Sequence, residues 1–127
     1  VAEALGLKNV TTCHERVESE KEHFDFMVSR AVMSLQELAK LVRKNVRDRQ
    51  QNALPNGLIC LKGGELQHET APFRKQAVCL NLNTYYKEPF FETKKIEYIP
   101  LGLKSSVLNS ICFPKTRMCF TTKRKKR

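Results

Sequence analysis

The sequence predicts an α/β fold, in which a parallel β–α–β unit carries two antiparallel strands at its edge. Three observations predict it: an apolar run at residues 24–28, an amphipathic helix after it, and a second apolar run at residues 58–61. A chain of 127 residues with 41% hydrophobic and 28% charged residues is enough for one folded domain. We divide the chain into this domain, residues 1–101, and a basic, unstructured tail, residues 102–127.

The residues before the first apolar run predict a helix end, a short strand and a loop. Residues 1–5 fit the last turn of a helix that ends at Gly6. The β-branched content of residues 9–13 favours a strand, and residues 14–23 are polar enough for a loop with one helical turn. Because a helix end stands here without its beginning, and no initiator Met precedes it, we expect the chain to be a piece of a longer protein.

Two short apolar runs predict buried parallel strands. Residues 24–28 form the first, and the run stops at residues 29–30, as a buried strand of a parallel sheet would. Residues 55–57 are turn formers, and residues 58–61 form the second run. A turn at residues 62–64 closes it.

The helix between these strands has the firmest signal in the chain. Ser34 followed by Glu37 is a capping box, which marks a helix start. Apolar residues then recur at helical spacing, at Leu35, Leu38, Leu41, Val42 and Val46. Basic residues fill the other face, at Lys40, Arg43, Lys44 and Arg47. Such a basic face is usually just solvated, although it would also allow a weak contact with RNA.

Later elements are shorter and less regular. Residues 65–73 read as a short helix that stops near Pro72. Residues 77–82 and 96–100 read as an antiparallel edge pair appended to the parallel sheet. Beyond Leu101 neither a helical nor a strand period is present, and no repeat is visible in the chain.

The net charge of +10 is concentrated at the end of the chain. Residues 102–127 contain eight Lys or Arg and no acid, which leaves residues 1–101 nearly neutral, at +2. Such a tail either binds phosphate by counterion release or is a solvated appendage, and we favour the second interpretation.

The cysteines and the apolar runs indicate which cellular compartment the protein occupies. Cys13, Cys60, Cys79, Cys112 and Cys119 are odd in number and lack zinc-knuckle or thioredoxin spacing, so we expect neither a metal site nor disulfides. No apolar run approaches the ~18 residues that a membrane span needs, and no secretory signal is visible. We therefore expect a cytoplasmic protein that does not enter the membrane.

The candidate site follows from the predicted sheet. Ligands of open parallel sheets bind beyond the carboxyl ends of the strands. Three segments are predicted to reach that edge: the loop with Arg16, Val17 and Glu18, the turn at residues 29–31, and the turn at residues 62–64. Each of the three carries a cation.

Three segments also carry a resemblance to a known family. In order and spacing, NVTTCHERVES, FDFMVSRAVMSL and GLICLKGGE resemble RsmG, also called GidB, the bacterial small-subunit (16S) rRNA guanine-N7 methyltransferases. The resemblance covers residues 1–101 and implies the rear half of a Rossmann-like class I methyltransferase domain. The family's leading helices, glycine-rich loop and first two strands have no counterpart in this chain. The resemblance further implies that the two missing strands would lie between residues 9–13 and 24–28, so we expect a gap in the sheet and low stability.

The resemblance assigns roles to five residues. It implies that the family binds S-adenosylmethionine, with Val17 and Glu18 beside the adenine and Arg30 beside the cofactor. It makes Arg16 and Lys62 suitable for phosphate or substrate RNA. Methyl transfer to guanine N7, which has a free lone pair, requires alignment more than a strong base. No catalytic residue and no metal is therefore expected.

Each assignment has a simpler alternative. Glu18 fits a solvated loop carboxylate, and Lys62 fits the solvated end of its strand, with Gly63 and Gly64 serving only the turn. Arg30 is the strongest candidate, because a cation directly at the end of a buried strand is poorly placed for solubility alone. The three histidines, His14, His23 and His68, fit surface positions.

These observations predict an incomplete, monomeric rRNA methyltransferase that is inactive and binds no cofactor by itself. The alternative is a non-enzymatic RNA-binding module built from the tail and the basic helix face. A third interpretation is another nucleotide-binding Rossmann-like protein, because a fold alone does not set function. The methyltransferase interpretation requires Arg30 and Lys62 to emerge side by side at the same rim of the sheet.

Overall fold

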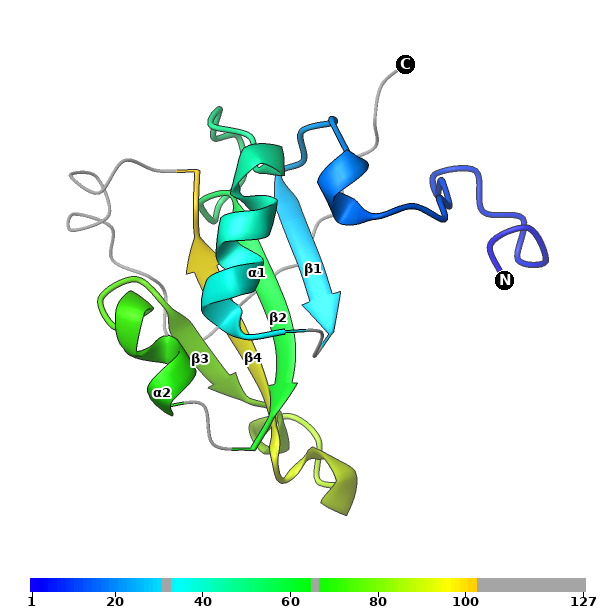
Figure 1. Ribbon diagram of the computed structural model, residues 1–127. Helices are drawn as coiled ribbons and strands as arrows, with labels where there is room; N and C mark the ends of the chain where they lie inside the picture. Colours follow the sequence, from blue (N-terminus) through cyan, green and yellow to red (C-terminus); the bar gives the residue numbers. More distant parts are fainter. Residues whose placement is uncertain (31–32, 65–66, 103–127) are drawn as a thin grey trace.

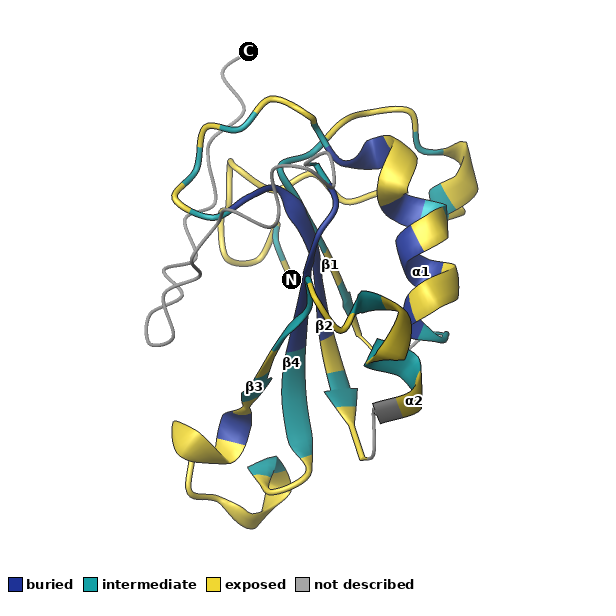
Figure 2. Cartoon of the chain, turned by 90° about the vertical axis from the view of Figure 1, so that its left-hand side faces the viewer, coloured by how far each residue is buried: buried dark blue, intermediate teal, exposed yellow. Residues whose placement is uncertain are grey.

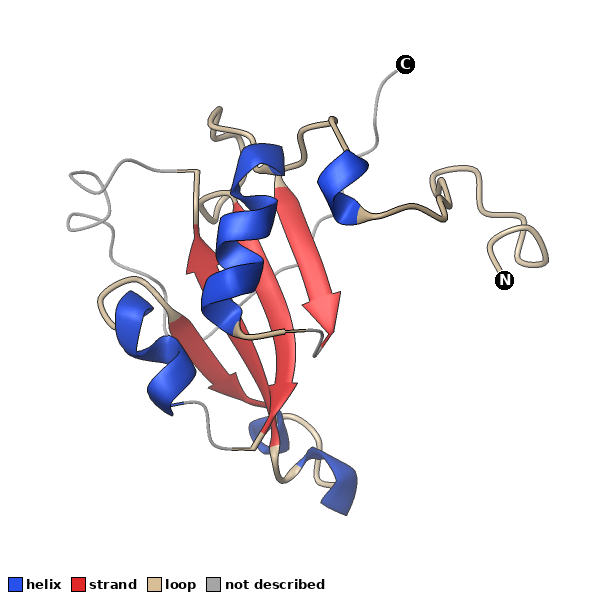
Figure 3. Ribbon diagram, viewed as in Figure 1, coloured by secondary structure: helices blue, strands red, loops and turns tan. Residues whose placement is uncertain are grey.

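The computed structural model describes residues 1–30, 33–64 and 67–102, and this part contains one mixed four-stranded sheet (Figure 1). The predicted tail beyond Gly102, with Cys112 and Cys119, lies outside the described residues. The strands are β1 (Phe26–Arg30), β2 (Gly57–Gly63), β3 (Val78–Asn81) and β4 (Lys94–Pro100). Their order in the sheet is β1-β2-β4-β3. The helix α1 (Leu35–Val42) covers one face of this sheet (Figure 3).

The predicted parallel β–α–β unit is confirmed. β1 pairs with β2 in parallel, from Phe26 opposite Gly57 to Arg30 opposite Leu61. β1 lies at the edge of the described sheet, and its side chain Val28 is 66% exposed. The prediction of a fully buried strand was therefore wrong for the face of β1 that points away from α1.

α1 begins as the capping box predicts. The Ser34 hydroxyl accepts a hydrogen bond from the Glu37 amide at 3.4 Å and donates to the Glu37 carboxylate at 2.7 Å. The inner face packs on β2 and β4 and forms the core, which contains Leu35, Leu38, Ala39, Val42, Val46, Leu58, Cys60, Ile99 and Leu101. The outer face is exposed (Figure 2).

The basic face of this helix is shorter than the spacing predicts. The helical path continues only through the 3-10 turn η2 (Arg43–Asn45). Arg47 lies beyond it and forms an ion pair with Asp25, 3.1 Å apart, so its prediction as part of a wet helix face was wrong. This ion pair instead ties the segment after the helix to the start of β1.

The second half of the domain matches the predicted antiparallel pair. β3 pairs with β4, from Val78 opposite Tyr98 to Asn81 opposite Lys95. β4 also pairs with β2, so β4 lies inside the described sheet, and β3 alone of this pair is at an edge. Between β2 and β3 lie α2 (Gln67–Thr70) and the 3-10 turn η3 (Ala71–Phe73), within the predicted short helix.

The start of the chain confirms two of three predictions. The Leu7 amide donates to the Ala2 carbonyl and the Gly6 amide to the Glu3 carbonyl, both at 3.0 Å, and Gly6 has a φ of 63°. This is the helix-ending motif that favours glycine. The loop that follows contains the predicted helical turn, η1 (Val17–Ser19). The predicted strand at residues 9–13 was wrong: the segment is exposed and pairs with no described strand.

Candidate functional site

The carboxyl ends of β1 and β2 form the rim where a ligand is expected. Arg30 lies opposite Leu61, and Lys62 is the next residue of β2, so both cations reach the same rim, as predicted. Side chains alternate along a strand, and Leu58 and Cys60 point into the core under α1. Lys62 therefore lies on the α1 face and Arg30 on the opposite face. The two residues share a rim, but not a face of the sheet.

Arg30 is the cation at this rim that a ligand can reach. Its side chain is exposed and makes no hydrogen bond or ion pair with another described residue. A guanidinium has five donors in a fixed geometry that matches carboxylates and phosphates. Arg30 thus offers an uncommitted anion contact at the end of a parallel strand. Ala31, predicted in the same turn, lies outside the described residues.

The Lys62 ammonium is bound by groups of the protein itself. Its ammonium donates to the Met33 carbonyl and to the Glu69 carboxylate, both at 2.7 Å, and its side chain is 9% exposed. The same carboxylate oxygen accepts from the Leu35 amide at 3.0 Å. The hydrogen bond from Lys62 holds the pKa of Glu69 below its ordinary value. The expectation that Lys62 faces phosphate or RNA does not fit this geometry, because the lysine joins β2, α2 and the first turn of α1.

The third predicted segment does not reach the rim. Lys44, just beyond the last turn of α1, donates from its ammonium to the Glu18 carbonyl at 2.6 Å. Val17 packs on the core, and Arg16 is exposed. α1 starts at the rim of Arg30, so η1 lies toward its other end (Figure 1). The prediction that all three segments share one edge was wrong for this loop, because the strand expected to deliver it is not formed.

Sequence reasoning missed a buried acid in β4. Glu97 lies between Cys60 and Cys79 on neighbouring strands and is 1% exposed. Neither of its carboxylate oxygens accepts a well-formed hydrogen bond from another described residue, although the Cys79 thiol interacts with this carboxyl group. Burial raises the pKa of Glu97, although Cys79 and Lys95 oppose this, and Glu69 adds to it. A single acid among the apolar residues 96–100 was the signal that could have found it.

The two cysteines beside this acid are not nucleophiles at neutral pH. Burial raises the pKa of the Cys60 thiol and of the Cys79 thiol to about 11 in each case. Since the thiolate is the reactive form, both thiols remain protonated and inert.

We expect Glu97→Gln to stabilise the chain at pH 7 by on the order of 1 kcal/mol, because it removes a buried carboxyl group whose ionisation is disfavoured by burial. A raised folded-state pKa favours folding below the unfolded pKa, and that contribution is lost as pH rises through the folded value. The benefit should therefore vanish near pH 4. Urea unfolding at both pH values measures it. An equal benefit at both would show that the pKa of Glu97 is the same in the folded and the unfolded chain. Exposed Glu92→Gln is the control, with no expected effect.

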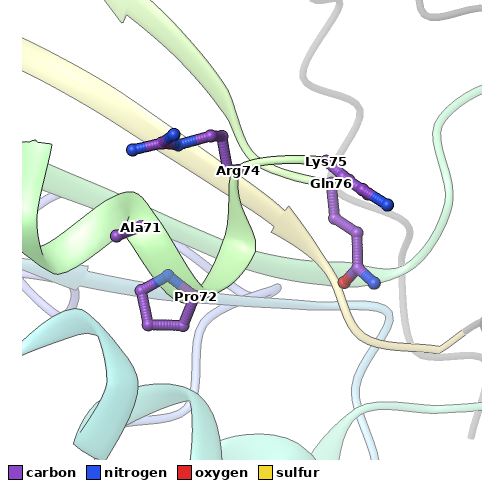
Figure 4. Close-up of a pocket in the computed structure, with 5 residues that line it drawn as sticks. All are labelled: Ala71, Pro72, Arg74, Lys75 and Gln76. Carbon is purple, nitrogen blue, oxygen red and sulfur yellow. The ribbon is translucent and has the colours of Figure 1, made fainter.

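A shallow hollow of about 390 Å³ lies away from this rim. It is lined by Ala71, Pro72, Arg74, Lys75 and Gln76 (Figure 4). It precedes the start of β3, at the opposite end of the parallel strands. The charged ends of Arg74 and Lys75 point in different directions (Figure 4). The two cations do not converge on one anion, so this hollow is not our candidate site.

Three observations concern metal binding, disulfides and membrane spans. Among the described residues, no group of three or more His, Cys, Asp and Glu side chains is arranged to hold a metal ion. Cys13, Cys60 and Cys79 are free thiols. In the same part of the chain, no helix combines the length and apolar character needed to span a membrane.

Comparison with known proteins identifies close relatives. The family model described as rRNA small subunit methyltransferase G (GidB) matches residues 1–95. "Ribosomal RNA small subunit methyltransferase G" of Parabacteroides distasonis is 63% identical over 101 residues, 80% of this chain and 44% of the relative. The protein of the same name from Porphyromonas gingivalis is 64% identical over 102 residues, 80% and 46%. That from Flavobacterium psychrophilum is 40% identical over 104 residues, 82% and 49%. The chain spans about half the length of the curated relatives it matches.

Proposed function

Since this chain belongs to the rRNA small subunit methyltransferase G (GidB) family, we propose that it is part of an enzyme that methylates guanine N7 of small-subunit ribosomal RNA. The methyl donor in this proposal is S-adenosylmethionine. The mixed sheet with its parallel β1–β2 pair fits a part of a Rossmann-like methyltransferase domain. We further propose that the protein acts as a cytoplasmic monomer.

The observation that carries this proposal is Arg30 at the carboxyl end of β1. In open α/β sheets this is the edge where ligands bind. The Arg30 guanidinium is exposed and uncommitted within the described structure. It suits the carboxylate of the cofactor, or a phosphate of the RNA beside it, because both are planar or oxygen-rich anions that a guanidinium binds with two parallel hydrogen bonds.

The chemistry requires little from the protein beyond this. The bound cofactor supplies a methyl group on a positively charged sulfur. Guanine N7 already has a free lone pair, so no residue has to remove a proton from it before transfer. Arg30 then orients an anionic group, and alignment of the reacting atoms accounts for the acceleration. Lys62 contributes indirectly, because it fixes the Met33 carbonyl three residues after Arg30.

The described residues fit the cofactor only in part. Of the three cofactor contacts predicted from the sequence, Arg30 lies at the rim, whereas Val17 and Glu18 lie toward the other end of α1. The chain also contains no glycine-rich phosphate loop, since its five glycines stand at Gly6, Gly57, Gly63, Gly64 and Gly102. We therefore propose that this chain does not hold S-adenosylmethionine by itself.

Two measurements test the proposal. Calorimetric titration of the chain with S-adenosylmethionine should give no heat of binding, and micromolar affinity would contradict the partial fit. A chimera should then join residues 1–101 to the preceding part of the Parabacteroides distasonis relative, which the 63% identity makes feasible. This chimera should transfer labelled methyl groups to small ribosomal subunits. Its Arg30→Ala variant should be slower by about 100-fold, as expected for lost alignment.

The matched control is Arg43→Ala in the same chimera, because Arg43 is exposed beyond the end of α1, away from the rim. Its rate should be unchanged. An active chimera that tolerates Arg30→Ala would remove Arg30 from the site. A folded chimera without any methyl transfer would contradict the function itself.

The basic RNA-binding module is the second candidate. Two of its four helix-face cations are committed within the protein: Lys44 to the Glu18 carbonyl and Arg47 to Asp25. That leaves the tail as the main support for this function. Deletion of residues 102–127 should abolish RNA binding if the tail is the module.

A further inference from the structure

The loop between β3 and β4 presents a cluster of aromatic rings, which we name the aromatic platform. It consists of Tyr86, Phe90 and Phe91, with Lys94 beside Phe90 and the exposed Tyr85 next to Tyr86 in the chain. Tyr85 is 57% exposed, Tyr86 50% and Phe90 64%. The rings of Tyr86 and Phe91 stack with centroids 4.7 Å apart, and Phe90 meets Phe91 edge to face at 5.2 Å. Exposed apolar clusters of this kind mark interaction sites more often than solitary exposed residues do.

Backbone hydrogen bonds and one buried leucine, rather than the aromatic rings, hold this loop in place. Of residues 82–93, all of which are described, only Leu82 is buried. Its carbonyl accepts hydrogen bonds from the Tyr85 amide at 3.0 Å and the Tyr86 amide at 2.9 Å. The Phe91 amide donates to the Glu88 carbonyl at 2.9 Å. Since one buried leucine and short turns hold the loop, the exposed rings are free to bind another molecule.

The platform lies at the same rim as Arg30. The Gly64 amide, at the end of β2, donates to the Thr93 carbonyl at 3.1 Å, and Gly63 pairs with Lys94. Lys94 lies on the same face of the sheet as Leu61 and Arg30, because Gly63 and Leu61 are two residues apart and Arg30 is opposite Leu61. This loop extends past the sheet, and most of its residues are exposed (Figure 2).

We propose that the aromatic platform stacks unpaired RNA bases that neighbour the target guanine. The inference rests on the proposed function and adds a substrate contact to it. Enzymes that modify a base act on single-stranded substrate or draw the base out of its stack, and the flanking bases then lack a stacking partner. Aromatic side chains replace that partner for any base sequence. Lys94 holds its ammonium 5.1 Å from the centre of the Phe90 ring, where it is available to the phosphate of a stacked nucleotide.

The local charges favour stacking over a purely electrostatic contact. Lys87, Lys94 and Lys95 are nearly balanced by Glu88 and Glu92. The Lys87 ammonium also donates to the Asn83 carbonyl at 3.1 Å. A surface with so little net charge releases few counterions on binding, so its contribution should depend weakly on salt.

Fluorescence anisotropy with a labelled 12-nucleotide single-stranded RNA tests the platform on the full chain, at about 0.3 M salt to weaken binding by the basic tail. Phe90→Ala should weaken binding by about 5- to 150-fold, the range that corresponds to loss of one stacked base. The slope of log affinity against log salt should not change. Phe90→Trp should bind as tightly as the unchanged chain or tighter, and Phe90→Leu should be as weak as Phe90→Ala.

The controls separate stacking from other roles. Leu5→Ala removes an exposed apolar side chain far from the platform and should leave affinity unchanged. A duplex of the same sequence should bind all variants equally, because its bases are already stacked. Circular dichroism should show all variants folded, as expected for a ring that is 64% exposed.

Four results would overturn the inference. The platform would not be an RNA contact if the unchanged chain had no affinity for single-stranded RNA. The same would follow if Phe90→Ala bound as tightly as the unchanged chain. Full affinity in Phe90→Leu would indicate apolar docking of another kind, and concentration-dependent association of the chain that Phe90→Ala abolishes would identify a self-association surface. These binding results need no cofactor, so they can fail while the chimera still methylates RNA, and the methylation test can fail while they succeed.

Discussion

Gly57→Ala is expected to lower the free energy of unfolding by about 3 kcal/mol, at the upper end for overpacking. Gly57 starts β2, with β1 on one side and β4 on the other. A Cβ at this position would overlap the Ile99 carbonyl oxygen and stand 2.9 Å from the Pro100 Cα. Both are backbone atoms of a paired strand, so neither can move without breaking the ladder. Urea unfolding followed by circular dichroism measures the loss.

Gly63→Ala is the matched control, because Gly63 is the last residue of the same strand. The atom nearest to an added Cβ there is the Lys94 ammonium nitrogen, at 3.3 Å, the far end of a flexible side chain. We expect a change below about 0.5 kcal/mol, as for surface substitutions. Equal losses in the two variants would show that close approach of β4 to Gly57 is not what requires glycine there.

The elements that local sequence determines were predictable. The capping box at Ser34 and Glu37 fixed the start of α1 to the residue, because the atoms involved are three residues apart. The apolar runs at residues 24–28 and 58–61 located β1 and β2 for a similar reason, since each strand is marked by a short continuous run of neighbouring apolar residues.

Features that depend on distant partners were not predictable. The strand expected at residues 9–13 has suitable residues but no neighbouring strand among the described residues, and a strand forms only where its backbone groups are paired. Without that strand, the loop with Glu18 lies near the carboxyl end of α1, where it contacts Lys44, and not at the rim. Lys62 reads from the sequence as a strand-end cation, and only the folded chain reveals that Glu69 folds back over it.

Glu97 illustrates a third limit. The alternation of β4 predicts which residues share a face, but not whether that face is covered. Glu97 lies opposite Cys60, on the face of the sheet that α1 covers. Alternation alone would place this acid in solvent, but its exposed fraction is 1%. Burial of this kind is a property of the whole layer packing, and no short stretch of sequence contains it.

Lys62→Met is expected to destabilise the chain by about 2 kcal/mol, because it removes the shared donor of a partly buried network. Methionine keeps the length and apolar contacts of the lysine stem. The Met33 carbonyl and the Glu69 carboxylate would each lose a 2.7 Å hydrogen bond. The loss should fall short of that for a fully buried pair, because the Glu69 side chain is 34% exposed and regains water.

The pH dependence of this effect has a defined sign. The pKa of Glu69 is lowered in the folded chain, chiefly by the hydrogen bond from Lys62. Its contribution to stability is therefore present above the ordinary carboxyl pKa, and it is lost as pH falls through the folded-state value. Unfolding free energies of the unchanged chain and of Lys62→Met should differ most at pH 7 and converge toward pH 3.

A double-mutant cycle with Glu69→Gln separates the pair from its surroundings. If Lys62 and Glu69 act as one unit, the double variant should lose less than the two single losses combined, by about 1 kcal/mol. Lys40→Met is the control, because Lys40 is exposed on the outer face of α1 and should change stability by less than about 0.5 kcal/mol. Additive losses would mean that Lys62 stabilises the fold through the Met33 carbonyl alone. Any contribution of Glu69 would then come from accepting the Leu35 amide at the start of α1.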